Sequence, residues 1–266
     1  MKFGILGPLA MVGRDGRSCV PSALKPRILL ANFLTRPGRI ASTAQLIEEL
    51  WDGRPPRTAT TALQVYISNL RKIFDEGGGP GASSAIMTCP PGYVFTMAGH
   101  EGDLERFESY RDEAERYETV GDRHEASALL RLGLKLWRGA ALADVRSTPQ
   151  LGLTAKRLDE LHIATLERRI ELDLNIGRHG ELVGELYALA GEHPSRERIH
   201  EYLMIALYNS GRPNEALRAY MAIRASLKEH SGLDPSNRLR ELQRVMLARR
   251  EDFVPVGGHW PVHASI

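Results

Sequence analysis

The sequence predicts a mainly α-helical protein with a small β component, divided into two domains. At 266 residues the chain is longer than a typical single domain, and its 42% hydrophobic and 26% charged residues are typical of globular proteins. Short strand-like segments surround three helical segments in the first third, whereas the second half is helical almost throughout. We therefore expect an N-terminal winged helix-turn-helix over 1–97, a linker over 98–103, a tetratricopeptide-like all-α domain over 104–250 and a flexible tail over 251–266.

The first strands are predicted at the start of the chain. The segments MKFGILGPLAMV and RSCVPS flank Asp15-Gly16, a residue pair favoured in tight turns, so we expect a small antiparallel sheet there. A first helix is expected over KPRILLANFLT, because Pro37-Gly38 stops its pattern.

Two further helices and a hairpin follow. Thr43 is a candidate cap for AQLIEELW, and Thr58 for the helix that contains TALQVYISNLRKIF. The glycine-rich EGGGPGAS ends that third helix, and IMTCPPGYVF predicts a short hairpin with Tyr93 near its tip. Three short helices followed by a hairpin are the outline of a winged helix-turn-helix, whose last helix enters the major groove of DNA.

The third helix has two contrasting faces. Apolar residues recur at three- and four-residue steps from Ala62 to Phe74, so one face packs on a core. The segment from Gly53 to Phe74 contains no acidic residue and includes Arg54 and Arg57. Residues 1–97 hold 11 Lys/Arg and 6 Asp/Glu, which leaves 24 and 27 for the rest. A helix that lies between two phosphate strands must offer donors and no carboxylates, and this one fits that requirement.

The second half contains an internal repeat. NIGRHGELVGELYAL from Asn175 and NSGRPNEALRAYMAI from Asn209 align at an offset of 34 residues, which is the tetratricopeptide period. Stacked helix pairs of this kind present a concave surface to partners. The alternative is an ordinary buried helical array that acts as a spacer.

Several segments together resemble the Streptomyces antibiotic regulatory protein (SARP) family. They are FGILGPL, LWDGRPPRTATTALQVYISNLRK, PPGYVF, LKLWRGAALADV and ALYNSGRPNEALRAYMAIRASLKEHSGLDP. The resemblance covers about residues 1 to 250 in the expected order. It implies a response-regulator-type winged helix followed by a bacterial transcriptional activation domain. It further implies an activator of secondary-metabolite (antibiotic) gene clusters that binds direct repeats near the promoter −35 region and recruits RNA polymerase, including its sigma factor.

Candidate DNA-binding residues follow from the third helix and its neighbours. One side of the helix presents Thr58, Thr61, Gln64, Ser68 and Arg71, with Val65 and Asn69 at its border. Glutamine pairs with adenine, arginine with guanine or phosphate, and valine with a thymine methyl group. Arg57, Lys72 and the indole N–H of Trp51 are better placed for phosphates, and Tyr93 is the candidate in the wing. Trp51 and Tyr93 each have an alternative interpretation as packed core residues.

Other chemistry is poorly supported by the sequence. Cys19 and Cys89 form no metal-spaced cluster, and His259 and His263 are separated by a proline in the expected tail. The GGGPG run lacks the lysine and Ser/Thr of a phosphate loop, and no catalytic arrangement of side chains can be argued. We expect no enzyme activity, no cofactor and no metal. The start of the chain is expected to be a strand and not a signal peptide, and the absence of membrane-length apolar runs predicts a cytoplasmic protein.

Two classes of function remain open. The favoured one is a sequence-specific transcriptional activator that binds double-stranded promoter DNA together with a second protomer. The alternative is a tetratricopeptide-like adaptor that acts by protein–protein contact without DNA binding. The exclusion of acidic residues from 53–74 favours the first. A fragment that ends near Gly102 is then expected to fold and to bind DNA weakly.

Overall fold

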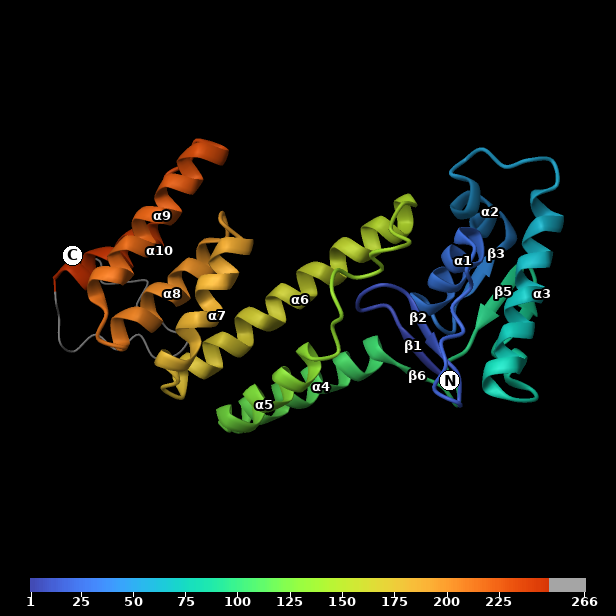
Figure 1. Cartoon of the computed structure of the whole chain (residues 1–266), viewed down its shortest axis with the longest axis horizontal. Helices are drawn as coiled ribbons and strands as arrows, with labels where there is room; N and C mark the ends of the chain where they lie inside the picture. Colours follow the sequence, from blue (N-terminus) through green and yellow to red (C-terminus); the bar gives the residue numbers. More distant parts are fainter. Residues whose placement is uncertain (249–266) are drawn as a thin grey trace. The chain divides into compact units, whose positions relative to one another are not determined.

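The computed structural model describes residues 1–248 and divides the chain into two compact units (Figure 1). The first unit comprises Met1–Asp112 and Leu132–Ile163, and the second comprises Glu113–Arg131 and the chain from Ala164 onward. The long helix α6 (Pro149–Asn175) contributes to both. The tail expected over 251–266, with His259 and His263, lies outside the described residues. No helix within 1–248 is long and apolar enough to cross a membrane.

The first unit begins with a small mixed sheet in the order β2-β1-β6. Strand β1 (Lys2–Gly4) pairs antiparallel with β2 (Ala10–Val12) and parallel with β6 (Glu101–Gly102). The expected reversal at Asp15-Gly16 is present, because the Gly13 N–H donates to the Arg17 carbonyl at 2.9 Å and the Cys19 N–H to the Met11 carbonyl at 2.8 Å. The chain also reverses between β1 and β2, at Gly7 with φ +144°. The second expected strand contributes only an isolated bridge between Val12 and Ser18.

The three predicted helices are present, although their caps differ from expectation. They are α1 (Leu24–Leu34), α2 (Thr43–Trp51) and α3 (Ala59–Gly78). Ser42, not Thr43, caps α2: its hydroxyl accepts from the Gln45 N–H while the Gln45 side chain accepts from the Ser42 N–H. The Thr43 hydroxyl instead donates to the Pro91 carbonyl at 3.1 Å. Thr58 stands at the cap position of α3 without a capping hydrogen bond.

A second antiparallel sheet has the order β3-β5-β4. The predicted hairpin is confirmed as β4 (Ile86–Cys89) and β5 (Gly92–Phe95), which follow a short 3-10 helix, η1 (Ala82–Ala85). Strand β3 (Ile40–Ser42), which the sequence pattern did not indicate, pairs with β5. A Cβ atom on Gly92 would overlap the Ala41 carbonyl oxygen, so this position requires glycine.

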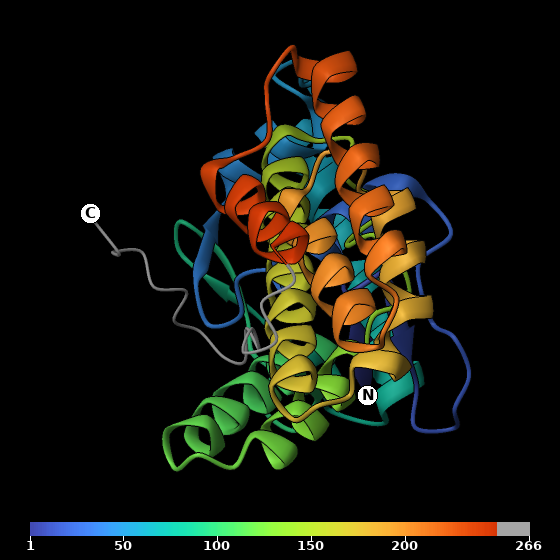
Figure 2. The same ribbon diagram turned by 90° about the vertical axis from the view of Figure 1, so that its left-hand side faces the viewer.

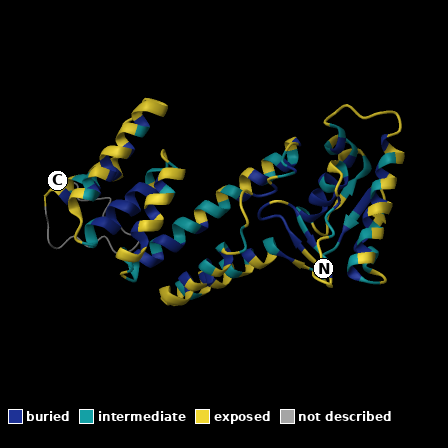
Figure 3. Ribbon diagram, in the orientation of Figure 1, coloured by how far each residue is buried: buried dark blue, intermediate teal, exposed yellow. Residues whose placement is uncertain are grey.

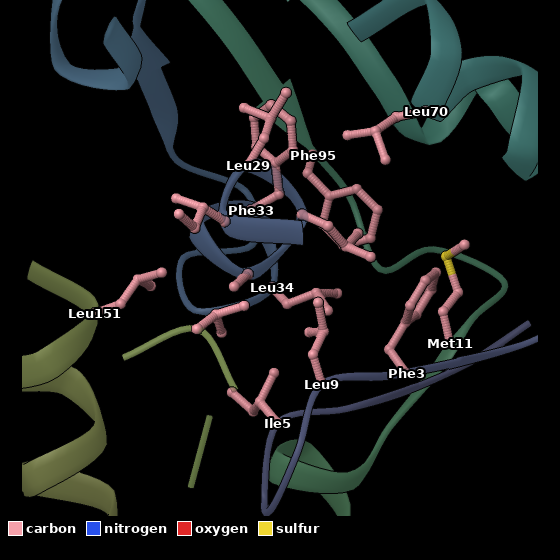
Figure 4. Packing of buried hydrophobic residues seen from close by; sticks show 14 of the residues in the cluster. Phe3, Ile5, Leu9, Met11, Leu29, Phe33, Leu34, Leu70, Phe95 and Leu151 are labelled. Carbon is pink, nitrogen blue, oxygen red and sulfur yellow. The ribbon is translucent and has the colours of Figure 1, made fainter. Parts of the chain in front are cut away.

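The core of the first unit extends well beyond residue 97. Figure 4 shows Leu151 of α6 in the same cluster as Leu34 of α1 and Leu9 of the N-terminal loop. Ala141, Leu142 and Val145, in the segment before α6, are also fully buried in this cluster.

The segment expected to be a linker, 98–103, is part of the first unit. It contains β6, and the Asp103 carboxylate accepts hydrogen bonds from the N–H groups of Ile5 and Leu6, at 2.8 and 3.1 Å. Helix α4 (Asp103–Thr119) begins directly after β6. The N-terminal loop is therefore hydrogen-bonded to the start of α4.

The second unit is helical and confirms the predicted repeat. Helices α7 (His179–Glu192) and α9 (Pro213–Ser231) begin 34 residues apart, each after a glycine with positive φ, Gly177 at 84° and Gly211 at 75°. The almost completely buried helix α8 (Glu197–Asn209) packs against both, as Figures 1 and 2 show. Two further helices complete the described residues of the chain, α5 (Arg123–Leu134) and α10 (Asn237–Leu247).

A buried ion cluster joins helices inside the second unit. The fully buried Asp173 of α6 accepts from the Ser127 hydroxyl and from Arg131 of α5, both at 2.6 Å, and from Arg169 at 3.1 Å. Arg169 is 2% exposed and also pairs with Glu185 of α7, with Nη1 2.8 Å from Oε2. The charges are compensated by one another, as burial requires.

Candidate nucleic-acid interface

Helix α3 is divided into a buried face and an exposed face, as its sequence predicts. Leu63, Leu70 and Phe74 are fully buried in the core of the first unit. The opposite face is exposed, and the alternation can be followed along α3 in Figure 3. Seven of the predicted site residues are exposed on α3 or at its start: Thr58, Thr61, Gln64, Val65, Ser68, Asn69 and Lys72. Arg57 is exposed in the preceding loop.

Carboxylates appear on α3 only in its last turns. Glu76 pairs with Lys72 at 3.8 Å, but both side chains are more than half exposed, so the pair is weak. Asp75 accepts a hydrogen bond from the Ser83 N–H at 2.9 Å, and this bond lowers the pKa of its carboxyl group. The Asp75 carboxylate is thus hydrogen-bonded to the loop after α3. The exposed face of α3 up to Lys72 carries no negative charge.

Arg71 connects α3 to the wing formed by β4 and β5. Its Nε donates to the Ile86 carbonyl and its Nη2 to the Thr88 hydroxyl, each at 3.0 Å. The side chain is half-buried, unlike the neighbouring Lys72. Because two of its donor groups are bonded to β4, this geometry favours a role in positioning the wing over the reading of a base.

Tyr93 lies near the tip of the wing, as predicted, but its side chain is buried. It is the second residue of β5, opposite Thr88 on one side and Ala41 on the other, and it is only 9% exposed. The tip is formed by Pro90 and Pro91, both exposed. The interpretation of Tyr93 as a packed core residue therefore fits the structure, because alternation along the strand turns its ring inward.

Trp51 lies beside α3 at the end of α2. Its indole ring stacks on Tyr66 of α3, with centroids 6.3 Å apart and planes 23° apart. No residue within 1–248 accepts a hydrogen bond from its N–H, which leaves this donor available. The Lys25 ammonium lies 4.0 Å from the centre of the same ring. Trp51 thus has both a packing contact and a free donor.

Sequence reasoning missed Lys25 and Thr88 as neighbours of the predicted site. Lys25 precedes Trp51 by 26 residues, and Thr88 follows Arg71 by 17, so no local periodicity relates them. The exposed Met87, 48% accessible on β4, was missed as well. Within residues 1–248 no group of three or more His, Cys, Asp or Glu side chains is arranged to hold a metal ion.

Comparisons with known proteins match both parts of the chain. A family model described as transcriptional regulatory protein, C terminal, matches residues 21–95, and one described as bacterial transcriptional activator domain matches 102–247. The chain is 36% identical to regulatory protein DnrI of Streptomyces peucetius, across 100% of this chain and 99% of DnrI. It is 40% identical to regulatory protein AfsR of Streptomyces coelicolor, across 93% of this chain but 24% of AfsR.

A solved structure has the same fold over most of the chain. It is that of Mycobacterium tuberculosis EmbR in complex with a low affinity phosphopeptide, which is 32% identical with a TM-score of 0.86. The alignment covers 94% of this chain and 65% of the EmbR chain.

The fold and the acid-free face of α3 define a winged helix-turn-helix DNA-binding protein with an additional helical unit. Its two matched domains occur in the order expected for a transcriptional activator. The chain belongs to the Streptomyces antibiotic regulatory protein family. It is accordingly a DNA-binding transcriptional activator, in a family of regulators and not of enzymes.

Proposed function

We propose that this chain inserts α3 into the major groove of promoter DNA and activates a secondary-metabolite gene cluster, as its family resemblance implies. One observation carries the DNA-binding geometry: α3 is fixed to the core through Leu63, Leu70 and Phe74 and exposes an opposite face without carboxylates up to Lys72. The major groove lies between two phosphate strands, and a rigid helix with hydrogen-bond donors on its exposed face can bind there.

The exposed residues divide into two groups by their chemistry. Gln64 suits adenine through its amide, and Val65, 51% exposed, suits a thymine methyl group. Thr61, Ser68 and Asn69 are short donors and acceptors for neighbouring base edges or sugars. The phosphate contacts are assigned to three groups at the ends and side of the helix: Arg57 and Thr58 before α3, Lys72 in its later half, and the Trp51 indole. We assign Arg71 to the support of the wing and leave Tyr93 out of the interface.

The operator and partners follow from the family resemblance. We propose that two protomers bind direct repeats near the −35 region, in the same orientation, so that they touch through unlike surfaces. The helical second unit would then recruit RNA polymerase and its sigma factor. We also propose that the protein acts in the cytoplasm, where promoter DNA is found.

The proposed DNA-binding unit is larger than residues 1–97. The side chains of Leu142, Val145 and Leu151 complete its core, and Asp103 holds its N-terminal loop. We propose that this segment transmits the docking of α3 to the rest of the chain, because it belongs to the same packed core.

Footprinting with the purified full chain, followed by spacing variants of the operator, tests the function. Genome-wide pull-down identifies the bound promoters, and inserting about 5 bp, half a helical turn, between the two repeats should abolish cooperative binding and activation. An insertion of about 10 bp, a whole turn, is the matched control and should restore part of both. If no discrete DNA site is protected, the protein-contact adaptor becomes the better explanation. If the 5 bp insertion changes nothing, the two-protomer assembly is wrong.

A further inference from the structure

Three residues from three helices form a continuous row beside α3. The Lys25 ammonium, in the first turn of α1, lies over the Trp51 ring with its Nζ 4.0 Å from the ring centroid. Trp51, the last residue of α2, stacks in turn on Tyr66 of α3. The row thus leads from an ammonium group on α1 to the helix that is proposed to read DNA.

The charge of Lys25 is not explained by the stability of the fold. None of the carboxylates within residues 1–248 forms an ion pair with it, and the first turn of α1 contains no acidic residue. A cation at a helix N-terminus is disfavoured by the helix dipole, so the charge of Lys25 does not stabilise α1. The Trp51 ring holds the ammonium through a cation–π contact, which leaves its N–H donors free for another acceptor.

The row and the wing lie on opposite sides of α3. Tyr66 carries the row and Arg71 holds the wing, and five residues correspond to a rotation of about 140° around an α-helix. The buried Leu63 and Leu70 fall within this narrow arc, and the exposed face lies in the wider arc on the other side. The exposed face is therefore bordered by the wing on one side and by the row on the other.

We propose that Lys25 binds a backbone phosphate of DNA on the flank of α3 opposite the wing, with Trp51 as its support. This inference rests on the proposed function, because it requires α3 to lie in the major groove. A helix in that groove has a phosphate strand on each side, and the wing faces only one of them. The ammonium group of Lys25 and the indole N–H of Trp51 then supply two donors to the second strand.

The test measures DNA affinity against salt for charge variants of the full chain. Lys25→Met keeps the apolar stem on Trp51 but removes the charge, and Lys25→Arg keeps the charge. We expect Lys25→Met to weaken binding to cognate and scrambled duplexes by the same factor, roughly 3- to 10-fold at 0.1 M salt, and to reduce the salt slope by about 0.9. Lys25→Arg should stay within about twofold of wild type, because a phosphate accepts either cation.

Two control variants distinguish a failure of the Lys25 contact from a failure of the proposed function. Lys228→Met removes an exposed charge from α9 of the second unit and reports the effect of net charge alone. Lys72→Ala tests the phosphate contact assigned to α3. Melting curves establish that each variant is folded, and Lys25→Gln is the second neutral variant if Lys25→Met melts earlier.

The outcomes are distinguishable. A salt slope reduced in Lys25→Met and Lys25→Gln but not in Lys228→Met supports the phosphate contact. If the neutral Lys25 variants behave like Lys228→Met while Lys72→Ala loses affinity, the inference fails and the proposed function stands. If Lys72→Ala also binds like Lys228→Met, the placement of α3 in the groove fails together with the inference.

Discussion

The guanidinium group of Arg71 on α3 donates to the Thr88 hydroxyl on β4 at 3.0 Å, and its Nε donates to the neighbouring Ile86 carbonyl. One half-buried side chain thus joins the exposed helix to the wing by hydrogen bonds, in addition to the core packing of Phe74 on Phe95. An arginine on a helix that is proposed to enter the major groove is a natural candidate for a base contact. In this structure, however, the Nε and Nη2 donors of Arg71 are bonded to a β-strand. The distinction between these two roles can be measured.

Replacing Arg71 should loosen the wing. We expect Arg71→Ala to lower the free energy of unfolding by about 1–2 kcal/mol, because two hydrogen bonds from a charged donor are lost. Hydrogen exchange at residues 86–95 should become faster, since β4 loses its hydrogen bonds to the Arg71 side chain. Thr88→Val, which removes only one of the two bonds, is the matched control and should have a smaller effect. Unchanged stability and exchange, with relaxed preference at a single base pair, would show instead that Arg71 reads DNA.

Removing Leu151 should destabilise the DNA-binding unit although the residue lies 54 positions beyond residue 97. Leu151 is fully buried in the core that also contains Leu34, so Leu151→Ala should cost about 2–5 kcal/mol in a urea unfolding experiment. Leu153→Ala, at a side chain 64% exposed on the same helix, should change stability by less than about 0.5 kcal/mol. Equal, small effects of the two substitutions would place Leu151 outside this core.

The same packing changes the expectation for a truncated chain. A fragment that ends at Gly102 lacks Asp103 and the apolar side chains of Leu142 and Leu151, so its core is incomplete. We expect such a fragment to show no cooperative thermal unfolding, whereas the full chain does. A sharp calorimetric transition in the fragment would show that residues 1–102 fold by themselves.

The second unit should depend strongly on Asp173. Asp173→Ala leaves the buried Arg169 with less compensation and removes the partner of Arg131, so we expect a loss of about 3–5 kcal/mol by chemical denaturation. The control is Glu241→Ala, which breaks an exposed pair with Arg244 and should cost less than about 0.5 kcal/mol. Similar losses of unfolding free energy from both substitutions would show that burial does not increase the contribution of the Asp173 ion pairs.

Mild acid should destabilise the second unit through His200. Burial lowers the pKa of this side chain, which is 5% exposed, whereas the unfolded chain protonates it near pH 6.5. As the pH falls through about 6.5 the unfolded state binds a proton that the folded state does not, so stability decreases, by up to about 1 kcal/mol at pH 5.5. His179 acts in the same direction, because burial lowers its pKa too.

His200→Gln should therefore reduce the slope of stability against pH between about 5.5 and 7. His124→Gln, at an exposed position, should leave the slope unchanged. Unfolding free energies measured at several pH values give both slopes. An unaltered slope in His200→Gln would mean that another group is responsible.

Local patterns were sufficient for the elements and for the main face of the site. The three-to-four residue spacing from Ala62 to Phe74 determined which side of α3 is buried, because apolar periodicity directly selects a packed face. The 34-residue offset likewise determined the repeat, with Gly177 and Gly211 in equivalent turns. These features depend on neighbours within a few residues or on repetition, and both are visible in the sequence alone.

Contacts between distant segments were decided only by the tertiary structure. Arg71 and Thr88, and Lys25 and Trp51, meet because packing brings separate elements together, and the pattern around each residue contains no sign of its partner. Leu151 completes the core of a unit from which a linker was expected to separate it. The sequence alone determined which face of α3 packs on the core and which face is exposed. The fold determined which of the free residues support the wing and which remain available, because a side chain's hydrogen-bond partners depend on three-dimensional proximity.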